Sequence, residues 1–96
     1  MYATVRRYEG VTNPREAARQ VEEAFLPLVS RIPGFVDYYW VDAGGGVMLS
    51  TTVFEDKAGA DESNVKAADV VRDKLAKVLP KPPQITEGEV IVHKAS

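Results

Sequence analysis

The order of strand-like and helix-like segments is the feature that most constrains this chain. β-Branched and aromatic runs predict strands at residues 2–8, 35–42 and 47–55, and a fourth at 89–94 for which a start near Ile85 is the alternative. One amphipathic helix is expected after the first strand and one after the third. The order β-α-β-β-α-β within 96 residues predicts one ferredoxin-like α+β domain, residues 1–96. Its four-stranded antiparallel sheet would carry both helices on one face.

The first helix has a clear start signal. Asn13 can cap it, Pro14 suits the first helical position, and Glu16 stands where a capping-box acid reaches back. Pro27 lies inside the helix and predicts a kink in its last turns. One apolar stripe is expected on this helix, formed by Ala17, Val21, Ala24, Phe25, Leu28 and Ile32.

The second helix begins at Asp56 or at Asp61, and Gly59 leaves its first turn open. Steps of three and four residues predict one inward face. That face comprises Asn64, Ala68, Val71, Leu75 and Leu79, with Ala67 and Val78 beside it.

Composition excludes several classes of function. The chain has no cysteine, which excludes disulfides, thiolate catalysis and zinc–thiolate sites, and its net charge of −2 does not favour nucleic acid or an anionic membrane. No apolar run is long enough to span a bilayer, and the first residues lack the apolar core of a signal peptide, so we expect a cytoplasmic location. We also expect no metal site, because no cluster of metal-ligating residues is apparent.

The strands place apolar side chains on both of their faces. In the second strand Phe35, Tyr39 and Val41 alternate with Val36, Tyr38 and Trp40, and the third strand behaves similarly. Two helices can cover only one face of the sheet. We therefore expect a homodimer in which sheet packs against sheet.

Two passages carry a resemblance to a known family. The Ile-Pro-Gly-Phe link at 32–35 and the Val-Phe-Glu-Asp-Lys-Ala-Gly-Ala passage at 53–60, with the length and element order, resemble the antibiotic biosynthesis monooxygenase superfamily. This resemblance covers nearly the whole chain. It implies a dimeric α/β barrel, a cleft between sheet and helices in each subunit, and members that include cofactor-free monooxygenases, haem-degrading enzymes and proteins without known activity.

Asn64 is the first candidate for a catalytic residue, since its amide could hydrogen-bond a substrate phenol or carbonyl. The alternative is a capping or water-binding role. The cofactor-free monooxygenases resemble the chain here, with an Asn on the second helix, but Ala68 stands where they carry a Trp. A haem-degrading site would need an Asn on the first strand and a Trp and a His on the second helix, and these are missing. The one histidine, His93, lies near the C-terminus.

Arg6 and Arg7 point to opposite faces of the first strand, so one of them approaches a covered surface. There it could bind a phenolate oxygen, or a carboxylate of the chain such as Asp37 or Glu89. We take Arg7 and His93 as further catalytic candidates after Asn64. The candidates for substrate binding are Tyr39, Trp40, Ala68 and Val71.

These observations predict a cofactor-independent, monooxygenase-like protein. It would bind or oxidise a small aromatic or phenolic molecule in the cleft, without metal or cofactor. The alternative is a non-enzymatic dimeric module of the same fold, either ligand-binding or stress-responsive.

Overall fold

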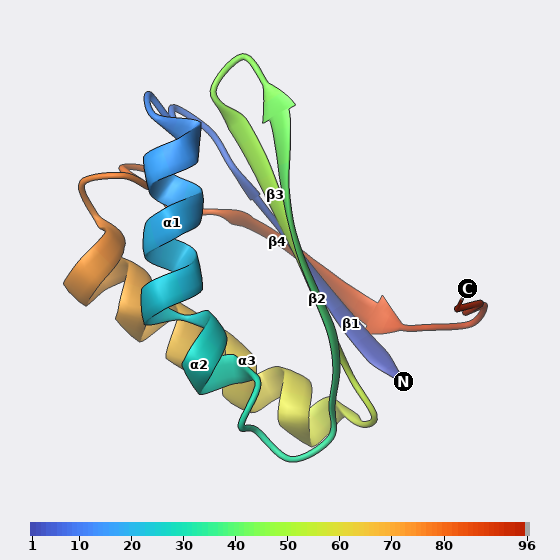
Figure 1. The fold of residues 1–96 in the computed structure, drawn as a ribbon. Coiled ribbons are helices and arrows are strands. Elements are labelled where there is room, and N and C mark those ends of the chain that lie inside the picture. The colour runs from blue at the N-terminus through green and yellow to red at the C-terminus, as the bar shows by residue number, and fades with distance from the viewer. Residues whose placement is uncertain (96) are drawn as a thin grey trace.

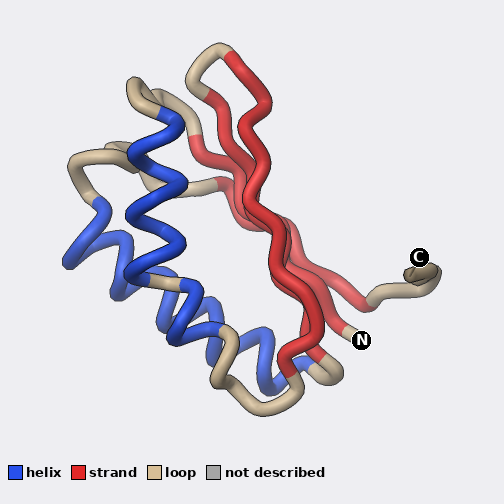
Figure 2. Tube along the Cα trace, in the orientation of Figure 1, coloured by secondary structure: helices blue, strands red, loops and turns tan. Residues whose placement is uncertain are grey.

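The fold is a twisted four-stranded sheet with all of its helices on one side (Figure 1). The computed structural model describes residues 1–95. Its elements are β1 (Tyr2–Tyr8), α1 (Pro14–Ala24), α2 (Leu26–Val29), β2 (Phe35–Gly44), β3 (Val47–Phe54), α3 (Lys57–Val70), the π-helical turn η1 (Val71–Leu75) and β4 (Gln84–Glu89). The strands are antiparallel in the order β2-β3-β1-β4, which confirms the ferredoxin-like α+β architecture. Figure 2 shows the two layers, with the opposite face of the sheet uncovered.

The cap and the kink of the first helix are as the sequence predicts, whereas the Glu16 carboxylate accepts hydrogen bonds from Arg19 and Gln20 instead of reaching back in a capping box. The Asn13 side chain accepts a hydrogen bond from the backbone N–H of Glu16 at 3.2 Å, and Pro14 opens the helix. The helix breaks at Phe25, and a short second segment containing Pro27 follows. Because proline lacks an N–H and its ring clashes with the preceding turn, a continuous helix cannot form here.

Asp56, and not Asp61, caps α3 by accepting a hydrogen bond from the backbone N–H of Gly59 at 3.0 Å. Gly59 lies against the strand that precedes it, and a Cβ on it would stand 2.5 Å from Cδ1 of Phe54. The missing side chain therefore allows the helix to approach the sheet closely. None of the helices within residues 1–95 is long and apolar enough to cross a membrane.

The inward face of the second helix differs from the predicted one in its first half. From Ser63 onwards its buried residues are Ser63, Ala67, Val70, Leu75 and Leu79, at steps of four, three, five and four. The step of five coincides with the π-helical turn, which holds one residue more than an α-turn. Leu75 and Leu79 therefore face inward as predicted, whereas Ala68 is exposed and Val71 is half-buried.

The fourth strand starts close to the alternative position near Ile85, but it ends at Glu89 and not at residue 94 as predicted. β4 runs from Gln84 to Glu89, and residue Tyr2, where β1 starts, pairs with Glu89. Residues beyond Glu89 have no further strand position to pair with, apart from one bond from the Val90 N–H to the Met1 carbonyl at 2.9 Å. The apolar run 90–92 therefore lies outside the sheet and is exposed at Ile91 and Val92.

The second strand also departs from strict alternation. A bulge between Phe35 and Asp37 places Phe35 opposite Phe54, on the side of the helices. Phe35 therefore shares a face with Tyr38 and Trp40, and the predicted pairing of Phe35 with Tyr39 on one face is wrong. Tyr39 lies on the uncovered face of the sheet and is 57% exposed.

Candidate functional site

Two adjoining hollows lie between the sheet and the helices. The outer hollow has a volume of about 330 Å³, and the inner one, of about 10 Å³, has room for one water-sized molecule. Both are lined by Arg6, Tyr8, Ala67, Val71 and Leu79. The hollows are therefore neighbouring parts of one site, with Arg6 and Tyr8 of β1 between them.

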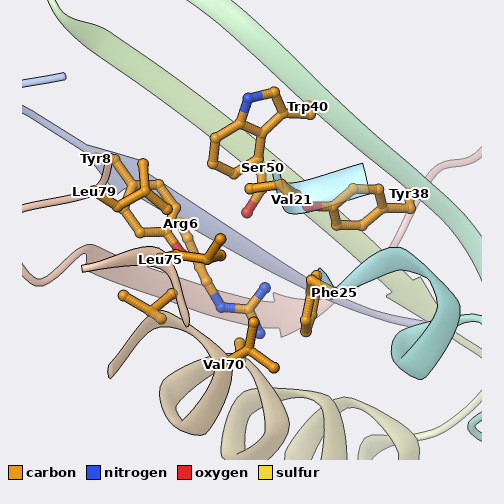
Figure 3. Close-up of a pocket in the computed structure, with 12 residues that line it drawn as sticks. Arg6, Tyr8, Val21, Phe25, Tyr38, Trp40, Ser50, Val70, Leu75 and Leu79 are labelled. Atoms are coloured by element: carbon orange, nitrogen blue, oxygen red, sulfur yellow. The ribbon is translucent and has the colours of Figure 1, made fainter. Parts of the chain in front are cut away.

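Aromatic side chains form the wall of the inner hollow (Figure 3). Tyr8 packs on Trp40 with ring centroids 5.4 Å apart, and Phe25 packs on Tyr38 at 5.7 Å. Tyr38 and Trp40 come from alternate positions of β2, so both face the helices.

Arg6 is the most unusual side chain of the site, because it is a cation with only 2% of its surface exposed. Its guanidinium donates hydrogen bonds to Oγ1 of Thr52 at 3.2 Å and to Oδ1 of Asn64. It also lies 6.0 Å from the centre of the Phe25 ring. Burial lowers the pKa of Arg6, but a guanidinium remains charged at any physiological pH.

No carboxylate forms an ion pair with Arg6 among the described residues. The nearest link to one is indirect, since the amide of Asn64 donates a hydrogen bond to Oε2 of Glu87 at 2.7 Å. Asn64 therefore helps to orient the guanidinium, and a buried positive charge lines the hollows without a direct counter-ion among residues 1–95.

The two tyrosines beside Arg6 are held in their neutral form. Burial raises the pKa of Tyr8, against the opposing effect of Arg6, and burial together with repulsion from Tyr8 raises the pKa of Tyr38. At neutral pH both keep a phenolic proton, so each can donate a hydrogen bond to an oxygen atom.

The outer hollow is mainly apolar. Its wall includes Ala68, Ala76, Ile85 and the three prolines of the connector that follows the helix, and the charged side chains at it are Arg6, Arg72 and Lys81. Arg72 pairs with Asp73 at 2.9 Å and with Asp69 at 3.3 Å.

The π-helical turn lies directly over this site. Val71 and Leu75, the first and last residues of the turn, both line the inner hollow. Such turns are rare and often occur at functional sites, because the additional residue moves one part of a helix sideways relative to the rest.

The structure brings some of the predicted site residues together. Trp40 and Val71 line the inner hollow, and Ala68 and Val71 line the outer one. Asn64 contacts the site through its hydrogen bond to Arg6. Four of the predicted residues therefore belong to one cluster.

The other three lie elsewhere. Arg7 points to the opposite face of the sheet and pairs with Glu9 at 3.2 Å. Tyr39 is on that uncovered face, and His93 follows the last strand, with Nε2 3.7 Å from Oδ2 of Asp37. None of these three lines either hollow.

Sequence reasoning missed Arg6 and Tyr8 as site residues. They share one face of β1 with Thr4, and alternation does place Arg6 and Tyr8 together. Choosing Arg6 over Arg7 requires the pairing of the strands, which sets Arg6 opposite Ser50 on the side of the helices. Within residues 1–95, no group of three or more histidine, cysteine, aspartate or glutamate side chains is arranged to hold a metal ion.

No protein-family model and no curated protein matches this chain, whereas solved structures do. A protein of unknown function from Nitrosomonas europaea superposes with a TM-score of 0.76 at 23% identity, covering 99% of this chain and 93% of that one. A monooxygenase of Streptomyces coelicolor, solved with nanaomycin D, gives 0.71 at 16% identity, with 99% and 91% covered.

Two further matches describe the same architecture. A putative antibiotic biosynthesis monooxygenase from Nitrosomonas europaea gives a TM-score of 0.73 at 15% identity, with 94% and 89% covered. A dimeric ferredoxin-like protein from an uncultured marine organism gives 0.65 at 14% identity, with 99% and 97% covered. The chain therefore has the ferredoxin-like fold of the antibiotic biosynthesis monooxygenase-like proteins.

Proposed function

We propose that this protein binds a small, flat aromatic molecule with a phenolic or enolic oxygen in the outer hollow, and oxidises it without a cofactor. The observation that carries this proposal is Arg6, a buried cation that pairs with no carboxylate of residues 1–95 and lies beside a mainly apolar cavity of about 330 Å³. That volume lies at the lower end of the range typical of small-molecule sites.

The chemistry follows from the charge. A guanidinium has five N–H donors, of which hydrogen bonds to Thr52 and Asn64 account for two. Away from bulk water a cation strongly favours a negative oxygen nearby, so Arg6 would lower the pKa of a bound phenol. The Tyr8 hydroxyl, kept protonated by burial, is suited to donate a second hydrogen bond to that oxygen.

A deprotonated phenol or enol can itself reduce O₂. For an enol, the ring CH₂ group of its keto form and O₂ yield a ring C=O group and H₂O, and for a hydroquinone the products are the quinone and H₂O₂. In both cases the substrate supplies the electrons. The protein would hold the substrate, stabilise its anion and keep water away. The S. coelicolor monooxygenase with nanaomycin D supports this assignment by likeness of fold.

One observation favours a second candidate, a binding protein without catalytic activity. The residues that line the two hollows include no aspartate, glutamate or histidine. Catalysis by an enzyme of this kind commonly uses a base with a pKa near 7, and the raised pKa of Tyr8 makes it unsuitable. In this alternative, Arg6 selects an anionic ligand but no proton is removed.

One experiment distinguishes the catalytic function from the binding function. Hydroquinones and anthrones are incubated with the protein under air, while O₂ consumption and product absorbance are followed. Arg6→Gln should reduce turnover at least tenfold, since it removes the cation that stabilises the anion. Arg7→Gln is the matched control and should leave turnover unchanged, because Arg7 lies on the other face.

Asn64→Ala should give an intermediate loss, because it removes one of the contacts that orient Arg6. Tight binding of these compounds without O₂ consumption would identify a binding protein. Equal turnover by the Arg6 and Arg7 variants would show that the site has been misassigned.

We further propose that the protein is a homodimer joined through the uncovered face of the sheet. Val5, Tyr39 and Val41 are exposed there, and Ile91 and Val92, 88% and 85% exposed, follow the last strand. Apolar side chains gathered in this way favour burial against a partner, and a second copy is the partner that the dimeric marine ferredoxin-like protein suggests. Light scattering at micromolar concentration should report twice the chain mass, and Val41→Lys should shift it towards the monomer. A wild-type monomer would contradict this arrangement.

A further inference from the structure

We propose that the ligand of the outer hollow carries a carboxylate at the end opposite its phenolic oxygen, and that Lys81 binds it. This inference specifies the ligand class and rests on the proposed function. It identifies an aromatic hydroxy acid as the type of molecule that the site recognises, and Lys81 as the residue that selects it.

The charge around the outer hollow is the first observation. Its ionisable lining residues, apart from Tyr8, are Arg6, Arg72 and Lys81, all of them cations. The chain as a whole has a net charge of −2. The charged residues that line this hollow are therefore all positive in a chain whose net charge is negative, and those without a carboxylate partner favour an acidic ligand.

The partners of these cations differ. Arg72 is neutralised by Asp69 and Asp73 on the same helix. Lys81 forms no ion pair with any of residues 1–95. At the lining of the hollow, Arg6 and Lys81 are therefore the charges left for a ligand.

The position of Lys81 is restrained by its surroundings. Its Cε lies 3.2 Å from the point where a Cβ on Gly10 would stand, so its stem passes closely over that glycine. Pro80 and Pro82 flank it in the chain and limit the backbone to few conformations. A restrained ammonium loses less conformational entropy when it binds than a freely moving one.

The two cations would define how the ligand lies. Arg6 is buried and would hold the phenolic oxygen, whereas Lys81 is exposed and would hold the carboxylate near solvent. Between them the ring system would lie against apolar residues such as Ala68, Val71 and Ile85. A neutral phenol lacks the second contact, so it should bind more weakly and in less defined orientations.

The test compares β-naphthol, naphthoate and the hydroxynaphthoate whose carboxylate lies at the end of the ring system opposite its hydroxyl. Binding is measured by fluorescence titration at low ionic strength. Hydroxynaphthoate should bind wild type roughly fivefold more tightly than β-naphthol, the scale of one partly exposed ion pair. Lys81→Gln should abolish that preference, so that the ratio of the two affinities falls to about one. Lys77→Gln, which removes an exposed lysine that lines neither hollow, is the matched control and should behave as wild type.

Failures of the two proposals are distinguishable. If β-naphthol binds and Arg6→Gln weakens it, but the carboxylate gives no gain or Lys81→Gln leaves the gain intact, the role of Lys81 is refuted and the site stands. If none of the three compounds binds, the proposed function fails, and this inference with it. The preference should also disappear in high salt, where exposed ion pairs are screened.

Discussion

Gly59→Ala offers a direct test of how closely α3 packs on the sheet. In an exposed helix, replacing glycine by alanine stabilises by about 1 kcal/mol. Here the new Cβ would stand 2.5 Å from Cδ1 and 3.0 Å from Cγ of Phe54, and 3.1 Å from the carbonyl oxygen of Pro33. Those distances are well inside van der Waals contact.

The neighbours cannot easily move away. Phe54 is fully buried and packs edge-on against Phe35 at 5.8 Å between ring centroids, and the Pro33 oxygen belongs to the backbone. Overpacking of this kind costs about 1–3 kcal/mol, and a contact as short as 2.5 Å belongs in the upper part of that range. After subtraction of the helical gain of about 1 kcal/mol, we expect a net destabilisation of about 1–2 kcal/mol. In a chain of this size that lowers Tm by roughly 5–15 °C.

Urea denaturation followed by circular dichroism measures the change, with the slope of the transition expected to stay constant. Gly88→Ala is the matched control, since nothing lies within 4 Å of a Cβ at that position, and its stability should be unchanged or slightly higher. A Gly59→Ala protein as stable as wild type would refute the close approach of helix and sheet described above.

Three further outcomes are expected. Asp73 is an exposed residue of the π-helical turn, and deleting it should convert the turn into continuous α-helix. The buried leucines would still point inward, so the fold should be kept, but the hollow would change shape and β-naphthol binding should weaken at least tenfold. Unaltered binding would contradict this. Ala68→Leu should narrow the outer hollow and weaken β-naphthol binding several-fold, whereas Ala58→Leu, exposed on the same helix away from the hollows, should not. The carboxyl of Glu16 has its pKa lowered to about 2 by its hydrogen bond with Arg19, so its small stabilising effect is complete above the ordinary pKa and disappears as pH falls through about 2. Carbon NMR titration of Arg19→Gln should find that pKa nearer its ordinary value, and an unmoved midpoint would rule out Arg19 as the cause.

The features that the sequence predicted correctly depend on local signals. Asn13 and Pro14 define a helix start within four residues of chain, and Pro27 interrupts the helix whatever surrounds it. The element order likewise follows from periodicity alone, and with it the ferredoxin-like topology.

The features that were missed depend on pairing between distant segments. Alternation separates Arg6 from Arg7, but only the position of the helices decides which of the two is buried. The end of β4 is set by the length of β1, because Glu89 pairs with Tyr2 and nothing in β1 remains for the residues that follow. The sequence 90–92 has strand-like residues but no strand position to pair with.

The inward face of α3 shows a third kind of limit. Counting back from Leu79 and Leu75 in steps of three and four leads to Val71, Ala68 and Asn64, which is one position away from the buried set before the turn. The π-helical turn introduces this offset, and no residue type in it marks its presence.

The same turn has a consequence for how this chain is compared with its relatives. A relative whose second helix is uninterrupted would be one residue shorter there, and a correct match would need a gap inside a helix. An alignment without that gap is shifted by one residue on one side of residues 71–75. Roles transferred by position to Asn64 and to Leu79 could then not both be correct. One inserted residue could likewise separate a relative with an open pocket from one whose pocket is closed, with little else changed in the sequence.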